Sequence, residues 1–417
     1  MSELKSQVKP FEISKLEVWE AYLKVRANKG APGVDGCTID DFEKDLKGNL
    51  YKIWNRMSSG TYFPPPVRGV EIPKAHGGGV RLLGVPTVAD RIAQTVVAAH
   101  LEKRVEPVFH PDSYGYRPGR SALDAVAECR RRCWDKKWVI DLDVSAFFDS
   151  VRWDLVVKAV EAHTDAAWVV LYVKRWLAAP LQLPDGTLRQ RDRGTPQGSS
   201  ASPVLANLFL HYAFDLWLAR NFRGVQFERY ADDAVVHCNT ERQAREVLRA
   251  IEGRMEEVGL RLHPTKTRIV YCGRDRRRDD TVATSFTFLG FTFQRRAARD
   301  RNGNIFTSFL PAVSKEALKK MSTEVRSWRL HMHIGYTFNE FARWINPIVR
   351  GWMQYYGAFY KTELYSLLRR INYYLMRWVR KKFRRLRTFA RFHRRWKQIV
   401  KAYPLFFVHW AWVHSIW

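Results

Sequence analysis

Three aspartates could support metal-dependent chemistry, because each lies beside apolar runs. Asp143 ends an apolar segment over 138–144, and the adjacent Asp232 and Asp233 lie between two further apolar runs. Carboxylates beside a buried sheet lose hydration and repel one another, so their cluster is costly unless a divalent cation neutralises it. Carboxylate oxygens suit Mg²⁺, and two such ions about 4 Å apart stabilise the attacking and leaving oxygens of phosphoryl transfer.

Adjacent aspartates alone do not identify such a site. The same pair occurs at 40–41 and 279–280, and pairs of this kind commonly form solvated turns. The flanking pattern is more informative. Alternate residues of a strand share one face, so Asp141 and Asp143 could point the same way. Apolar runs within 226–238 predict a strand, a turn at 231–233 and a second strand.

Hydrophobic periodicity predicts the elements that must position these residues. We expect helices over 15–28, 88–105, 121–134, 153–177, 202–219 and 241–258. We expect strands over 67–72 and 80–85, forming a hairpin around 74–79, and over 138–144, 268–271 and 286–293. Only helical patterns follow from about Ser314, which predicts an α+β domain followed by an all-α domain.

The composition favours a nucleic-acid partner. The 417 residues include 70 Lys and Arg against 42 Asp and Glu, a formal charge of +28, together with 16 Trp, 17 Tyr and 24 Phe. A polyanion would relieve the repulsion, and aromatic rings could stack on unpaired bases. A charged tail alone would be the simpler explanation. Hydrophobic residues at 46% exclude disorder throughout the chain.

Five cysteines without a C-x-x-C pair argue against a disulfide framework and against a cysteine-rich zinc module. Cys129 and Cys133 are four apart on an expected helix, which favours packing. The first ten residues are polar and charged, so no signal peptide is expected. The apolar stretch 402–417 is shorter than the ~20 residues that span a bilayer. We therefore expect a cytoplasmic protein of bacterial type, working at the nucleoid and away from membranes.

A basic segment near the C-terminus is the strongest candidate for RNA contact. No Asp or Glu follows Glu363, and 376–397 is expected to form one helix with cations on nearly all sides. Five aromatic residues interleave with these cations, a mixture that matches structured RNA with splayed bases. The nucleic-acid-binding candidates are Arg377, Arg380, Lys381, Lys382, Arg384, Arg385 and Arg387, and Arg391, Arg394, Arg395 and Lys397 extend the run. A solvated charged face is the alternative.

The turn Tyr230-Ala231-Asp232-Asp233 has the form of the YxDD box, and through it the chain resembles the reverse transcriptases, or maturases, encoded by group II introns. Eight further blocks, in the same order along the chain, carry the resemblance. Besides the turn they resemble the N-terminal extension (28–36), two fingers blocks (72–86 and 113–118), the first-aspartate block (143–149), the nucleotide-site block (194–203), a lysine-bearing block (260–267), the last palm block (288–291) and the thumb (346–352).

The resemblance implies a right-hand polymerase of α+β class, with fingers, a palm built on an antiparallel sheet, and an α-helical thumb or X domain. It places an N-terminal extension at 1–62, fingers and palm at 63–295, the thumb at 296–385 and a basic aromatic tail at 386–417. No cysteine follows Cys272, so the chain resembles the compact subgroup without an endonuclease. Such a protein must borrow its primer.

The resemblance also assigns roles to single residues. Asp143, Asp232 and Asp233 would hold two Mg²⁺ ions, for which Mn²⁺ could substitute. Lys74 and Arg81, on the fingers hairpin, would clamp the incoming triphosphate, since Arg suits bidentate contact; a solvated hairpin is the alternative.

Three further residues would contact the incoming nucleotide. Gln197 would meet its sugar or the template-paired base, unless it is a plain loop amide. Phe148 would exclude ribonucleotides by bulk at the 2′ position, with Phe147 as the alternative and a core role open for both. Lys266 would neutralise or protonate pyrophosphate, and Asp149 is expected to be structural.

The implied function is RNA-directed DNA synthesis together with assistance to splicing and mobility of the intron RNA. Its partners would be group II intron RNA, the RNA template–DNA primer duplex, target DNA and dNTPs, and dimerisation is left open. A non-enzymatic RNA-binding maturase is a second hypothesis, which the intact aspartate trio disfavours. A domesticated reverse transcriptase in defence or repair is a third.

Overall fold

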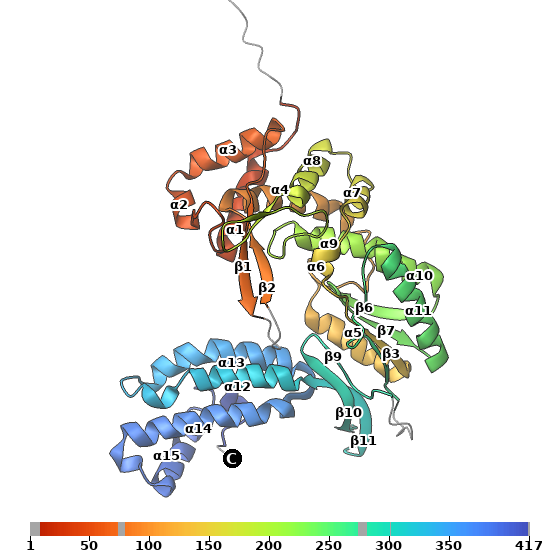
Figure 1. The fold of residues 1–417 in the computed structure, drawn as a ribbon. Helices are drawn as coiled ribbons and strands as arrows, with labels where there is room; N and C mark the ends of the chain where they lie inside the picture. Colours follow the sequence, from red (N-terminus) through yellow and green to blue (C-terminus); the bar gives the residue numbers. More distant parts are fainter. Residues whose placement is uncertain (1–8, 74–79, 274–281, 301, 416–417) are drawn as a thin grey trace, which may run out of the picture. The chain divides into compact units, whose positions relative to one another are not determined.

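The computed structural model describes residues 9–73, 80–273, 282–300 and 302–415 (Figure 1). The chain divides into two compact units. Unit 1 comprises Met1–Ser121, Leu142–Ala234 and Arg245–Thr267, and unit 2 comprises Ala122–Asp141, Val235–Ala244 and Arg268–Trp417. Both units are therefore built from segments that are distant in sequence.

Unit 1 begins with a cluster of helices. These are α1 (Lys15–Asn28), α2 (Ile39–Glu43), α3 (Leu46–Ser58) and α4 (Val88–Val105). Ser14 and Glu17 form a reciprocal capping box that fixes the start of α1, and Thr87 caps α4. Helix α4 packs against α1 and α3 and is buried along much of its length.

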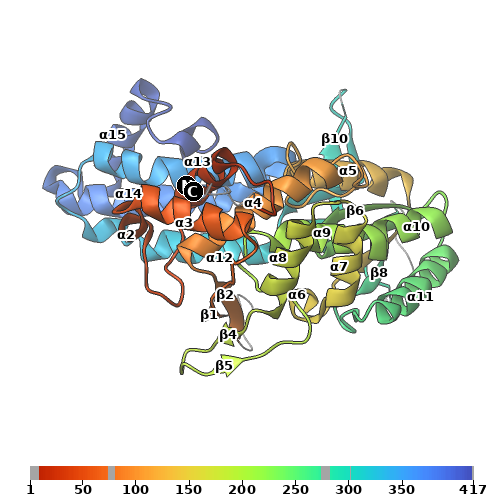
Figure 2. The ribbon, with the colours of Figure 1, turned by 90° about the horizontal axis from the view of Figure 1, so that it is seen from above.

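A small sheet of order β2-β1-β4-β5 adjoins these helices in unit 1 (Figure 2). Its strands are β1 (Val67–Pro73), β2 (Val80–Val85), β4 (Leu181–Gln182) and β5 (Leu188–Arg189). Strand β1 is antiparallel to β2 and parallel to β4. The predicted hairpin is confirmed in its two strands, while its tip lies outside the described residues.

The helices that follow in unit 1 differ from the prediction. They are α6 (Phe147–Ser150), α7 (Trp153–Glu161), α8 (Ala167–Ala178), α9 (Ser202–Leu210), the π-helix η1 (His211–Asp215) and α10 (Leu216–Asn221). The single helix predicted over 153–177 is wrong, because the chain breaks between α7 and α8. There the Thr164 hydroxyl accepts a hydrogen bond from the Ala166 N–H, which gives the backbone a turn in place of helix.

A four-stranded sheet of order β6-β7-β3-β8 carries the aspartates. Its strands are β3 (Trp138–Leu142), β6 (Gln226–Tyr230), β7 (Asp233–Cys238) and β8 (Arg268–Tyr271), and its neighbours in sequence are α5 (Ala122–Asp135) and α11 (Glu241–Glu257). Strands β3 and β8 are antiparallel, with Asp141 opposite Arg268 and 3.3 Å between Asp141 Oδ2 and Arg268 Nε. The predicted strand, turn and strand over 226–238 are confirmed.

Unit 2 continues with an antiparallel ribbon. Its strands are β9 (Phe286–Phe288), β10 (Phe291–Arg299) and β11 (Ile305–Val313). The single strand predicted over 286–293 is wrong, because Leu289 and Gly290 both have positive φ, 50° and 80°, and form a turn. The predicted domain boundary between 295 and 296 falls within β10.

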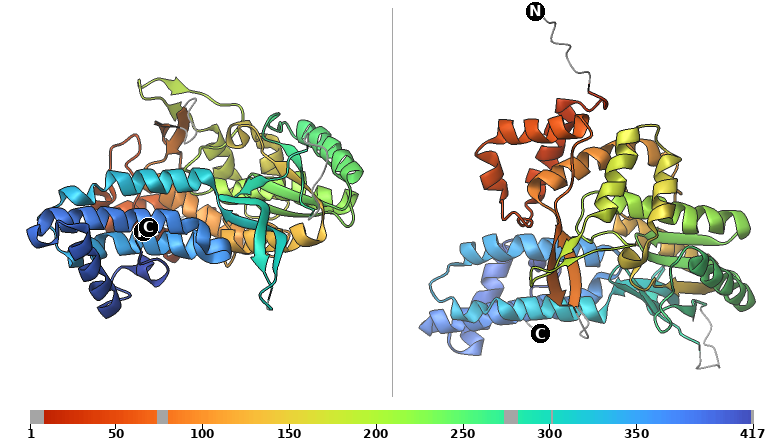
Figure 3. Two further views of the ribbon diagram at one scale, coloured as in Figure 1. Left: turned by 90° about the horizontal axis from the view of Figure 1, so that it is seen from below. Right: turned by 45° about the horizontal axis from the view of Figure 1, so that its top comes forward.

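A helical bundle completes unit 2 (Figures 1 and 3). It contains α12 (Lys315–Ser327), η2 (Leu330–Met332), α13 (Phe338–Tyr360), η3 (Lys361–Leu364), α14 (Tyr365–Lys382), η4 (Arg384–Leu386), α15 (Phe389–Ala402) and η5 (Val408–Ala411). Helices α12, α13 and α14 run alongside one another in both figures. The helix predicted over 376–397 is wrong, since α14 ends at Lys382 and α15 begins at Phe389.

The aromatic residues of the basic segment divide between core and surface. Trp378, Phe392 and Trp396 are buried in the hydrophobic core of the bundle, so they are not available to stack on bases. Phe383 and Phe389 are exposed.

Taken along the chain, the elements form the predicted α+β part followed by the predicted all-α part. Within the described ranges, no helix is long and apolar enough to cross a bilayer.

Candidate active site

The turn between β6 and β7 places two of the aspartates at a strained point of unit 1. Ala231 has φ of 56°, a left-handed conformation that costs an L-residue about 1–2 kcal/mol. A Cβ at Gly115 would lie 2.4 Å from the Ala231 nitrogen, so only glycine allows this close approach. Asp232 follows Ala231 and is half-buried, and Asp233 opens β7 and is exposed.

Asp143 directly follows β3 and is held by the segment 260–267. Its carbonyl accepts hydrogen bonds from the His263 N–H (2.7 Å) and the Thr267 hydroxyl (3.3 Å). Its carboxylate lies 3.1 Å from the Lys266 ammonium. Lys266 therefore pairs with the first aspartate, a contact that its predicted role at pyrophosphate did not include.

The charges of Asp143 and Arg81 both affect the pKa of Asp232. Burial raises the pKa of Asp232 above its ordinary value, and the charge of Asp143 raises it further. Arg81 and Arg229 act in the opposite direction. Asp143 and the exposed Arg81 of β2 therefore lie near enough to Asp232 for their charges to act on it.

This donor set fits a divalent cation. The trio offers hard carboxylate oxygens, which are the ligands that Mg²⁺ prefers. Metal binding by the three residues stays a prediction.

The segment 194–203, which is predicted to line the nucleotide site, is held by backbone contacts on two sides. The Gly84 N–H of β2 donates to the Gln197 carbonyl (2.7 Å), and the Thr195 N–H donates to the Phe148 carbonyl (2.7 Å). Phe147 is buried at 2% exposure, whereas Phe148 is only half-buried. Phe148 is therefore the more exposed of the two rings predicted to contact the nucleotide.

A buried polar network supports the same loop from α4. The Gln94 amide oxygen accepts hydrogen bonds from the Ser199 hydroxyl (2.6 Å) and the Ser200 N–H (2.8 Å). The Gln94 amide nitrogen donates to Asp90 (2.9 Å), whose carboxylate also accepts from Tyr62 and Trp176. Burial raises the pKa of Asp90 to about 6, although these three hydrogen bonds lower it.

We expect Asp90 to make folding stability depend on pH. Because its folded pKa of about 6 exceeds the ordinary 3.8, the folded state binds the proton more tightly than the unfolded state does. Stability should therefore fall by about 2 kcal/mol as pH rises from 4 to 6, out of about 3 kcal/mol in all, and level off above about pH 7. In wild type, the free energy of unfolding measured in urea should include this decrease between pH 4.5 and pH 7. In Asp90→Asn the decrease should be absent. An unchanged pH difference in the variant would contradict the prediction, and Asp149→Asn, at an exposed carboxylate, is the control.

The remaining candidates are placed as follows. Lys74 lies outside the described residues. Four of the seven basic candidates contact other parts of unit 2, namely Arg377, Arg380, Lys381 and Lys382. Arg384, Arg385 and Arg387 are exposed and, within the described part of the chain, have no ion pair or side-chain hydrogen bond.

Sequence reasoning missed several residues of the site. Tyr116 lies beside Tyr230, with ring centroids 6.2 Å apart. Burial raises the pKa of Tyr116, and the charges of Asp232 and Asp233 raise it further. Arg229 is fully buried inside β6. Its signal was a charged residue within an apolar strand, since buried arginines are rare unless paired.

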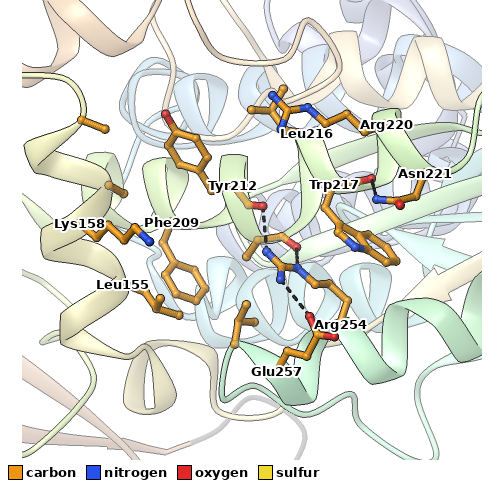
Figure 4. A pocket seen from close by; sticks show the side chains of 14 residues that line it. Leu155, Lys158, Phe209, Tyr212, Leu216, Trp217, Arg220, Asn221, Arg254 and Glu257 are labelled. Atoms are coloured by element: carbon orange, nitrogen blue, oxygen red, sulfur yellow. Dashed lines mark hydrogen bonds and ion pairs between the residues drawn. The ribbon is translucent and has the colours of Figure 1, made fainter.

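A separate pocket lies on the outer side of η1 in unit 1 (Figure 4). Its volume is about 570 Å³, and it is lined by residues of α7, of the α9–η1–α10 segment and of α11. Figure 4 shows the Arg254 guanidinium, which donates to the Tyr212 and Ala213 carbonyls and to the Glu257 carboxylate. The predicted catalytic and nucleotide-binding residues are not among those that line it.

Comparisons with known proteins identify two families. The family described as "Reverse transcriptase (RNA-dependent DNA polymerase)" matches residues 72–293, and "Group II intron, maturase-specific domain" matches residues 318–396. Protein YkfC of Escherichia coli (strain K12) is 32% identical over 313 residues, which cover 66% of this chain and 79% of YkfC.

Two further matches differ in how much of each chain they cover. The group II intron-encoded protein LtrA of Lactococcus lactis subsp. cremoris is 32% identical over 193 residues, covering 46% of this chain and only 32% of LtrA. Among solved structures, telomerase from Candida albicans in complex with a fragment of telomeric RNA matches with a TM-score of 0.48 at 12% identity, covering 89% of this chain and 68% of that chain.

Proposed function

We propose that this chain, a member of the family of group II intron reverse transcriptases, extends a DNA primer along an RNA template. One observation carries the proposal: Asp143 directly follows β3, and the Asp232–Asp233 turn opens the neighbouring strand β7 of the same sheet, although 89 residues separate Asp143 from Asp232 in sequence. A chain that only bound RNA would have no need to keep these carboxylates together.

The residues of the site divide the chemistry among them. Asp143, Asp232 and Asp233 would hold two Mg²⁺ ions, and when bound these stabilise charge on the attacking and leaving oxygens. Arg81 would bind the triphosphate of the incoming dNTP, and the backbone-anchored loop of Gln197 would orient its sugar and base.

Primer extension tests this function. We expect the purified chain to extend a DNA primer on an RNA template with Mg²⁺, and EDTA to abolish the product. A DNA template and Mn²⁺ in place of Mg²⁺ provide the comparisons. Absence of extension under all metal conditions, with RNA binding intact, would favour the non-enzymatic maturase.

Phe148 should set the choice between deoxyribonucleotides and ribonucleotides. Its backbone carbonyl accepts from the Thr195 N–H, and its ring is half-buried, so the ring would exclude a 2′-hydroxyl by bulk. Phe148→Val should raise ribonucleotide incorporation relative to dNTP incorporation by about tenfold to a hundredfold, measured as the ratio of kcat/KM values. Phe147→Val, at the buried neighbour, should lower stability without this change. The reverse outcome would assign the role to Phe147.

The maturase-specific domain supports a second role in binding the intron RNA for splicing and mobility. The exposed Arg384, Arg385 and Arg387 lie within the matched residues 318–396 and could contact RNA phosphates. Target DNA would be a further partner, and a cytoplasmic, nucleoid-associated location would suit these substrates.

A further inference from the structure

A fully buried arginine lies directly beneath the catalytic turn. The Arg229 side chain on β6 is 1% exposed, and Asp215, its partner, is 0% exposed. The pair is bidentate, with Arg229 Nε donating to Asp215 Oδ1 and Arg229 Nη2 donating to Asp215 Oδ2, both at 2.7 Å. Two charges removed from water in this way persist only when their geometry and hydrogen bonding are complete.

The other donors of Arg229 complete the set. Nη1 donates to the Asn207 amide oxygen (3.0 Å) and to the Ala231 carbonyl (2.9 Å), and Nη2 donates to the Ser113 hydroxyl (2.8 Å). All five N–H groups of a guanidinium therefore have an acceptor. The Asn207 amide nitrogen in turn donates to the Gly115 carbonyl (2.7 Å), at the glycine that the turn approaches.

The bond to Ala231 connects this network to catalysis. Ala231 adopts the left-handed conformation and directly precedes Asp232. Fixing its carbonyl restrains the peptide that sets the direction of the Asp232 side chain. A positively charged donor is well suited to holding an unfavourable backbone conformation, because its hydrogen bonds are stronger than those of neutral donors.

The π-helix η1 explains how Asp215 reaches Arg229. Asn207 and Asp215 both bond Arg229, although they are eight residues apart. In a regular α-helix eight residues turn about 80° beyond two full turns, so the two side chains would diverge. The extra residue of a π-turn removes about one 100° step from that rotation, which aligns them to within about 20°.

We propose that Arg229 and Asp215 form a positioning pair, which holds the Ala231–Asp232 peptide in the orientation that the catalytic carboxylates require. The inference rests on the proposed polymerase function. The pair acts through the turn, while Asp143, Asp232 and Asp233 would contact the metal ions.

Arg229→Lys tests the pair while keeping its charge. A lysine ammonium can bond Asp215, but it lacks the planar fork needed to reach Ala231 and Ser113 at the same time. We expect kcat for primer extension to fall about a hundredfold, because small misplacements of reacting groups have effects of this size. The Mg²⁺ concentration for half-maximal activity should rise about tenfold, and RNA affinity should stay within about twofold, since the thumb is unchanged.

A second substitution separates positioning from simple destabilisation. Ala231→Gly removes the penalty of the left-handed conformation, so it should restore kcat of the Arg229→Lys variant by about tenfold. Tyr212→Phe is the matched control, because Tyr212 belongs to the same π-helix but faces the outer pocket (Figure 4). It should leave kcat and the Mg²⁺ requirement unchanged.

The outcomes distinguish the two proposals. If the wild-type chain does not extend primers, the proposed function fails. If wild type is active and Arg229→Lys matches it in kcat and Mg²⁺ requirement, the positioning role is overturned. It is also overturned if the lost activity is accompanied by a normal Mg²⁺ requirement and is not relieved by Ala231→Gly, since the pair would then only stabilise the fold.

Discussion

Asp232→Asn should reduce DNA synthesis by more than about a thousandfold, because it removes one charge of the carboxylate trio where metal ions would stabilise the transition state. A thousandfold loss corresponds to about 4 kcal/mol of activation free energy. The amide keeps the size of the side chain, and Asp232 is half-buried, so the fold should persist. The measurement is single-turnover primer extension on an RNA template.

RNA affinity provides the internal reference for this variant. Asp232 belongs to unit 1, whereas the exposed arginines expected to bind RNA belong to unit 2, so affinity should stay near wild type. Asp149→Asn is the matched control, since it neutralises an exposed carboxylate six residues after Asp143. Extension at the wild-type rate by Asp232→Asn would remove Asp232 from the metal site.

Elements with local start and stop signals were predictable from the sequence. The predicted bounds of 15–28 and 88–105 coincide with α1 and α4, whose first turns are fixed by Ser14 and Thr87. Capping is a short-range interaction, so its residues are visible in a single sequence. The helix predicted over 202–219 likewise matches α9, η1 and α10 in extent, but its π-turn gave no such signal.

The supporting network of the site was not predictable in this way. Asp90 looks like an ordinary acidic residue in the first turn of a helix, and its partners Tyr62 and Trp176 come from other parts of the chain. Arg229 likewise bonds Ser113 and two residues of the α9–η1–α10 segment, Asn207 and Asp215. Hydrophobic periodicity reports which face is buried, and it carries no information on which polar groups meet there.

The basic segment shows the opposite error, in which a strong local pattern was extended too far. Arginine and lysine favour helices, and neither glycine nor proline interrupts 376–397. A continuous helix would place Arg380 over Arg384 and Lys381 over Arg385, and like charges four apart repel. The chain instead ends α14 at Lys382, and the Arg380 guanidinium donates to the Arg387 carbonyl across the break.

Arg384, Arg385 and Arg387 lie at this break and are the best candidates to contact RNA phosphates. Replacing Arg384, Arg385 and Arg387 together by glutamine should weaken RNA binding by about tenfold to a hundredfold near physiological salt. Each lost phosphate contact lowers the number of counterions released on binding, so the slope of log K against log salt should become shallower by about two to three. The measurement is a salt titration of binding to a structured RNA.

Replacing the same three arginines by lysine separates charge from geometry. Lysine keeps the charge but loses the bidentate fork, so the salt slope should remain while affinity falls only a few-fold. Primer extension at saturating template should be unaffected in both variants, because the catalytic aspartates are untouched. A glutamine variant with an unchanged salt slope would show that these arginines face solvent in the complex. Contact would then have to come from the remaining cations of 376–397, several of which already bond the bundle itself.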